Sequence, residues 1–137
     1  MRTFLAVAAI LAWLFAAMLL FAPAAFYEPV GITLTPLLAT VAQAHGATLF
    51  GLGVVNWLAR KADPRGVVAI LTGNLVVQLL SLGVVVRTWS LNPDAKALPG
   101  AVIHIVLGSL FGYFLIRARR AEVQGREAVP LSHARQA

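Results

Sequence analysis

The chain has 137 residues, of which 60% are hydrophobic and 12% charged, and its formal net charge is +6. A soluble domain carries roughly 25% charged residues, so this composition, with a mean hydropathy of +0.84, indicates a single integral membrane domain. The chain lacks cysteine, which excludes disulfides, zinc–thiolate sites, iron–sulfur clusters and thiol catalysis. Its positive charge lies in the gaps and ends of apolar runs, which argues against nucleic-acid binding.

Four apolar segments follow one another along the chain, at residues 4–22, 37–59, 66–86 and 98–116. Each is close to the ~20 residues that a helix needs to cross a bilayer, and none contains Asp, Glu, Lys or Arg. Open strands would leave backbone groups unsatisfied in lipid. The sequence therefore predicts an all-α fold, a four-transmembrane-helix bundle with up-down-up-down order.

The gaps between these segments carry helix-start signals. Thr35–Pro36, Asp63–Pro64 and Asn92–Pro93 each place an N-cap residue before a proline at the first helical position. They predict the starts of the second, third and fourth spans. Pro99 is expected either to restart or to kink the fourth helix.

The distribution of Lys and Arg predicts the orientation. With the N-terminus inside, nine of these residues are cytoplasmic and only Arg87 and Lys96 are outside, which gives an N-in/C-in topology. Residues 1–117 are predicted to form the transmembrane domain and residues 118–137 a disordered, basic cytoplasmic tail, with anionic-lipid binding as an alternative role. The motif Ala22–Ala24 leaves open that the first span is a cleaved signal peptide.

Two histidines lie inside apolar runs, and an ionisable group in the membrane is a functional-site hypothesis by default. At 1.5 Å per residue, His45 and His104 lie roughly 12 and 9 Å below the outer ends of their helices, so they share a depth. Asn74, Gln78 and Ser81 follow i, i+4, i+7 spacing on one helix face. Asn74 is expected in the inner half of the membrane, closer to Asn56 of the second span. The outer part of the predicted polar interior consists of Gln43, His45, Gln78, Ser81 and His104.

Small residues predict which helix faces touch. In the fourth span Gly100, His104, Gly108 and Gly112 share one stripe, so His104 is expected on a packing face. Comparable stripes in the first two spans consist of Ala8, Ala12, Ala16, Ala42, Gly46 and Gly53. Trp13 is expected to be core or lipid-facing bulk.

These residues leave three functional classes open. The first is a non-enzymatic accessory or packing module, in which the histidines link helices. The second is a redox protein in which His45 and His104 bind haem b as axial ligands, or in which histidine and glutamine hold a quinone. The third is a small transporter or a lipid-binding protein. A hydrolase or transferase is disfavoured because no carboxylate lies in the spans to orient a base.

The stretches "LFAPAAFYEPVGI", "AQAHGATLFGLGVVNWLAR" and "GNLVVQLLSLG" resemble small bacterial four-helix membrane proteins of the DoxX-like type and their uncharacterised relatives. The resemblance implies a bacterial inner-membrane location, and some such proteins resemble accessory subunits of quinone-linked enzymes. It implies no catalytic residue. The expected partners are the lipid bilayer and either a second copy or a larger membrane complex, with no cofactor as the first choice and haem b or quinone as the alternatives.

Overall fold

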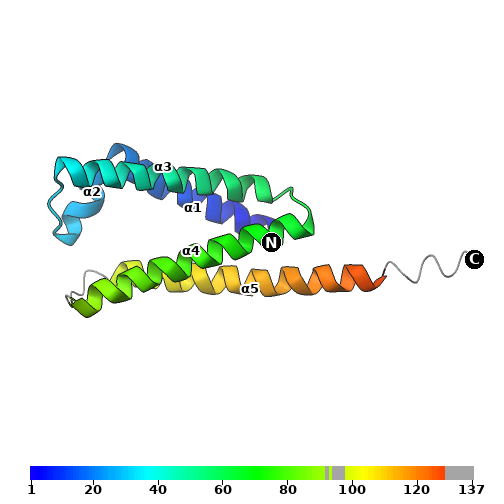
Figure 1. Ribbon diagram of the computed structural model, residues 1–137. Helices are drawn as coiled ribbons and strands as arrows, with labels where there is room; N and C mark the ends of the chain where they lie inside the picture. Colours follow the sequence, from blue (N-terminus) through cyan, green and yellow to red (C-terminus); the bar gives the residue numbers. More distant parts are fainter. Residues whose placement is uncertain (92, 94–97, 129–137) are drawn as a thin grey trace, which may run out of the picture. The chain divides into compact units, whose positions relative to one another are not determined.

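The computed structural model describes residues 1–91, 93 and 98–128, with side chains up to residue 124. Over these residues the chain is helical and contains no strand (Figure 1). Its long helices are α1 (Arg2–Phe21), α3 (Pro36–Ala59), α4 (Pro64–Leu91) and α5 (Leu98–Ala128). All four are long and apolar enough to cross a membrane. The predicted all-α class with four spans is confirmed, while the direction of crossing stays a prediction.

The predicted outer loop between the first two spans is itself largely helical. It contains α2 (Pro23–Tyr27) and the 3₁₀ helix η1 (Glu28–Val30). Pro23 starts α2 at a position where its missing N–H costs nothing. Gly31 ends η1 with φ 77°, a left-handed conformation that a residue without Cβ adopts readily.

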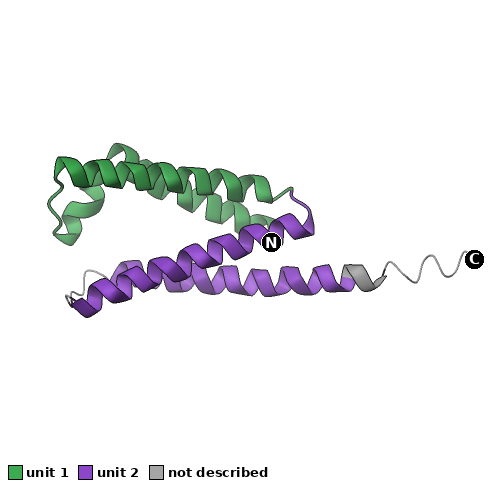
Figure 2. Cartoon of the chain, in the orientation of Figure 1, with its two compact units in different colours: residues 1–61 green, residues 62–137 purple. Residues whose placement is uncertain are grey.

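The chain divides into two compact units, residues Met1–Lys61 and Ala62–Ala137 (Figure 2). Each unit is a hairpin of two long antiparallel helices, α1 with α3 in the first and α4 with α5 in the second. The boundary falls in the short α3–α4 connection, inside the stretch predicted as one domain.

Two of the three predicted helix starts are confirmed. Thr35 Oγ1 accepts from the Leu38 amide at 3.2 Å, and Asp63 Oδ1 accepts from the Gly66 amide at 2.9 Å. The third prediction is wrong: Pro93 is not helical and α5 begins at Leu98, with Pro99 in its first turn. Asn92 itself lies outside the described residues. The proline instead follows the end of α4 at Leu91, because a proline disfavours helical geometry in the residue before it.

The α1–α3 hairpin packs through small residues. Ala8, Ala9 and Ala16 are buried on α1, and Ala42, Gly46 and Gly53 are buried on α3; Ala12 is half-buried. A Cβ on Gly46 would lie 3.1 Å from the Ala16 carbonyl oxygen, so the backbones of α1 and α3 approach each other closely at this point. This agrees with the predicted small-residue faces of the first two spans.

The α4–α5 hairpin buries larger side chains. The buried face of α4 repeats at helical spacing through Val67, Leu71, Asn74 and Gln78. The buried side chains of α5 include Phe111, Leu115 and Ala118. Where the helices meet, a Cβ on Gly108 would lie 3.4 Å from the Gln78 Cβ, which is an ordinary contact distance. Gly108 is thus on the packing face predicted for the fourth span.

Helix α5 continues past the end of its apolar run at Ile116 to Ala128. The segment from Arg117 on is rich in Ala, Arg and Glu, which favour helix. The predicted boundary at residue 117 is therefore no break in the helix, and the predicted disordered tail is wrong up to Ala128. Residues 129–137 of that tail lie outside the described residues.

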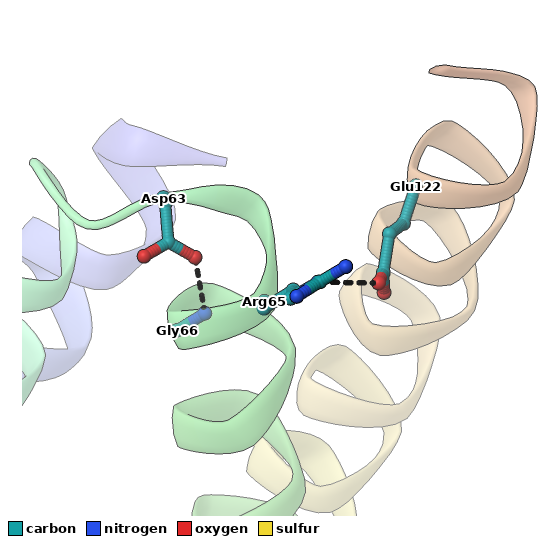
Figure 3. A network of polar contacts seen from close by, with 4 residues as sticks. All are labelled: Asp63, Arg65, Gly66 and Glu122. Carbon is teal, nitrogen blue, oxygen red and sulfur yellow. Dashed lines mark hydrogen bonds and ion pairs between the residues drawn. The ribbon is translucent and has the colours of Figure 1, made fainter. Parts of the chain in front are cut away.

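An ion pair joins the beginning of α4 to the C-terminal part of α5, at the open end of this hairpin. Arg65 on α4 lies 3.6 Å from Glu122 on α5, and Asp63 caps the same turn of α4 through the Gly66 amide (Figure 3). The Arg65 side chain is 76% exposed, so this ion pair contributes little stability.

Candidate functional site

A polar contact joins α4 to α5 within the span. His104 Nδ1 lies 2.8 Å from Gln78 Oε1. Gln78 is buried and His104 is half-buried. The structure therefore brings together two of the five predicted site residues, from helices that the sequence shows only as separate apolar runs.

The chemistry of this contact fixes the histidine ring. An amide oxygen can only accept, so His104 Nδ1 carries the hydrogen and donates it to Gln78. In the neutral ring the lone pair is then on Nε2. Gln78 thus sets both the orientation and the tautomer of His104, as hydrogen-bond partners do for ligating histidines.

The neighbours of this pair are polar or small. Asn74, one turn from Gln78 on the same α4 face, is buried, and its Nδ2 donates to the Ile70 carbonyl at 2.9 Å. Ser81, one turn on the other side, is half-buried. Gly108 of α5, one turn after His104, faces Gln78, and a Cβ there would be in ordinary contact with the Gln78 Cβ. The predicted i, i+4, i+7 face of α4 is thus turned inward, and Gln78 on this face bonds to His104 of α5.

The other two predicted site residues belong to the α1–α3 hairpin. Gln43 is exposed, and its Nε2 donates to the Leu20 carbonyl at the end of α1, at 3.2 Å. His45 is exposed on α3, next to the buried Gly46. His45 and His104 belong to different units, so their predicted shared site stays a prediction.

A polar contact inside the α1–α3 hairpin was not predicted from the sequence. Trp13 Nε1 donates to the Phe50 carbonyl at 3.2 Å, and the indole lies against Gly53, where a Cβ would come within 2.4 Å of Nε1. Its ring centroid is 5.5 Å from that of Trp57. A mid-span tryptophan opposite a glycine-rich helix is the only sequence signal for this contact.

The polar groups of the described residues are well satisfied. Through residue 124 no buried side-chain nitrogen or oxygen lacks a hydrogen-bond partner. Over the same part of the chain, no group of three or more His, Cys, Asp or Glu side chains is placed to hold a metal ion. The arrangement supplies oriented hydrogen bonds between helices and one histidine of fixed tautomer.

No family model, no curated protein sequence and no solved structure matches this chain. The resemblance to DoxX-like proteins therefore stays a prediction. The four apolar helices are those of a multi-pass membrane protein.

Proposed function

We propose that this protein is a non-enzymatic accessory module of a bacterial inner membrane, in which polar side chains link helices. The observation that carries this proposal is the bond from His104 Nδ1 to Gln78 Oε1. It uses the polar groups of a histidine and a glutamine to hold α4 on α5.

The other polar contacts support the same role. Gln43 and Trp13 each donate to a main-chain carbonyl of the other helix, and both bonds connect α1 with α3. Interhelical hydrogen bonds in membranes contribute about 0.6 kcal/mol on average and up to about 1.7 kcal/mol. Side chains used in this way fix the register of a hairpin, and they need no bound group to account for their presence in the span.

A double-mutant cycle with His104→Leu and Gln78→Leu in detergent-solubilised protein tests the proposal. His104→Leu should cost about 1–3 kcal/mol, because it leaves the buried Gln78 amide without its partner. The double variant should cost less than the sum by about 0.6–1.7 kcal/mol. Ser81→Ala, on the same face of α4, should change stability by less than about 0.5 kcal/mol. Strictly additive losses would contradict the proposed link.

A redox role is the second candidate, and one observation favours it. Gln78 accepts the Nδ1–H of His104, which is the tautomer and the supporting hydrogen bond that an axial histidine of haem b or a quinone-binding histidine has. A visible spectrum of the purified protein, oxidised and then reduced with dithionite, separates the two candidates. Haem bands that vanish in His104→Leu would replace the accessory role by the redox one.

A further inference from the structure

Two arginines lie on one exposed face near the end of α5. Arg117 and Arg120 are exposed and stand three residues apart on α5, whereas the nearby Leu115 and Ala118 are buried. Arg119, between the two arginines, is also exposed but lies on another face of the helix. At 100° per residue, Arg117 and Arg120 point away from the side of α5 that carries the buried residues. They form a positively charged face, defined here as the arginine face.

A tyrosine orients the first of these arginines. Arg117 Nη1 donates to the Tyr113 hydroxyl at 3.3 Å, and its guanidinium carbon lies 5.8 Å from the centroid of the same ring. A guanidinium has five N–H donors, so this contact positions Arg117 and leaves donors for another acceptor. Tyrosine is enriched at membrane–water interfaces.

An arginine of the other hairpin shows the contrast. The Arg60 guanidinium carbon lies 3.2 Å from the centroid of the Trp57 ring, and its Nε donates to the Trp57 carbonyl at 2.8 Å. Arg60 is half-buried against its own helix. One face of the Arg60 guanidinium is covered by the Trp57 ring, whereas Arg117 is exposed and bonds through Nη1 to the Tyr113 hydroxyl.

The nearest acid on α5 does not neutralise the arginine face. Glu122 lies on the side of α5 that faces α4, where it pairs with Arg65 at 3.6 Å (Figure 3). Glu122 is therefore turned away from the arginine face. Among the side chains described through residue 124, the structure gives Arg117 and Arg120 no ion pair.

The depth of this face along α5 matches the level of lipid headgroups. From Leu98 to Arg117 the helix rises about 28 Å at 1.5 Å per residue, close to the ~30 Å of a hydrocarbon core. We propose that the arginine face binds the phosphate of an anionic phospholipid, with Arg117 and Arg120 as donors and Tyr113 as the residue that orients Arg117. Arginine suits this partner because its planar fork donates two parallel bonds to phosphate oxygens. The proposal rests on the membrane location of the proposed function and not on its His104–Gln78 link.

Native mass spectrometry of the full chain in nonionic detergent tests this site. Dioleoyl phosphatidylglycerol and dioleoyl phosphatidylcholine are titrated separately, and the phosphatidylglycerol should bind more tightly. Arg117→Gln should weaken phosphatidylglycerol binding about fivefold, the effect of one arginine near an anionic surface. Arg119→Gln removes the same charge from the same turn but from another face, and should weaken binding less than about twofold.

Three results would overturn the site. Equal affinity for the two lipids would remove the anionic preference, and equal losses in Arg117→Gln and Arg119→Gln would reduce the effect to diffuse charge. Displacement of the lipid by inorganic phosphate would assign the face to a free anion. Far-UV circular dichroism checks that each variant is folded, and Arg117→Lys, which keeps the charge but not the planar fork, should give an intermediate affinity. The result is independent of the His104–Gln78 cycle, so either proposal can fail alone.

Discussion

The two hairpins solve the same packing problem by different means. In the α1–α3 hairpin, alanines and glycines bring the backbones close, and the polar contacts between the helices run from a side chain to a main-chain carbonyl. Both hairpins bury leucines, but the α4–α5 hairpin also buries Phe111, and its polar contacts between the helices run from side chain to side chain. Helix packing in the first hairpin therefore depends on small residues, and helix packing in the second depends on paired polar side chains.

The largest expected effect tests the first half of this comparison. Gly53→Ala adds a Cβ at 2.4 Å from Trp13 Nε1 and 2.5 Å from its Cδ1. The indole must then move and lose its bond to Phe50, at a cost of about 1–3 kcal/mol for overpacking. Gly51→Ala is the matched control, because a Cβ there has no neighbour within 4 Å. Equilibrium unfolding in mixed detergent, followed by far-UV circular dichroism, measures the stability of both variants. Equal stability of the two would contradict the close packing of Trp13 against Gly53.

The helix caps give the next largest effect, with one in each hairpin. Thr35→Ala and Asp63→Ala each remove a side-chain acceptor from the first turn of α3 or α4, and each should cost about 1 kcal/mol. Only the Asp63 loss should shrink with added salt, because that cap is charged and interacts with the helix dipole. Asp63→Asn keeps a capping oxygen and should recover most of the loss. A salt-independent Asp63→Ala would show that its charge contributes nothing.

The ion pair at the ends of α4 and α5 should have a smaller effect. Arg65→Gln removes a 3.6 Å contact from a side chain that is 76% exposed, and should cost less than about 1 kcal/mol. Unfolding at low and high ionic strength measures it, and the difference from wild type should fade as salt screens the pair. A loss above that of Asp63→Ala would mean that paired charge, and not the cap, secures this end of the hairpin.

The smallest expected effect contrasts the two hairpins directly. Gly108→Ala places its Cβ 3.4 Å from the Gln78 Cβ, and the better helix propensity of alanine offsets any strain by about 1 kcal/mol. Stability should stay unchanged or rise slightly in the same unfolding assay. If Gly108→Ala destabilised the protein as much as Gly53→Ala, the contrast would fail, because the α4–α5 hairpin would then depend on small residues as the α1–α3 hairpin does.

The sequence predicted the helices better than it predicted their contacts. The apolar run at 37–59 matches α3 almost to the residue, because Thr35–Pro36 gives a local start signal. Helices α4 and α5 extend beyond their apolar runs, to Leu91 and Ala128. Apolarity marks the part of a helix that suits lipid, whereas a helix ends only where caps or breakers end it. The prediction from Asn92–Pro93 was wrong for another reason: a proline that follows a helix and a proline at the start of a helix have the same local sequence signal.

The candidate site was predicted in part. The face carrying Asn74, Gln78 and Ser81 follows from helical periodicity alone, and the glycine stripe around His104 placed that residue on a packing face. The pairing of Gln78 with His104 depends on the register of α5 against α4, which no local pattern specifies. The contact of Trp13 with Gly53 depends in the same way on the register of α1 against α3.

The aromatic contacts of the first hairpin have a spectroscopic consequence. Of the three tryptophans, Trp13 and Trp57 lie in the α1–α3 hairpin with ring centroids 5.5 Å apart, while Trp89 is an exposed residue of α4. Two indoles at this separation couple their electronic transitions and should give an exciton couplet in the far ultraviolet. That couplet, and the emission quenching that accompanies close indoles, report on one hairpin alone. This signal would show whether the α1–α3 hairpin unfolds before or after the rest of the helical structure.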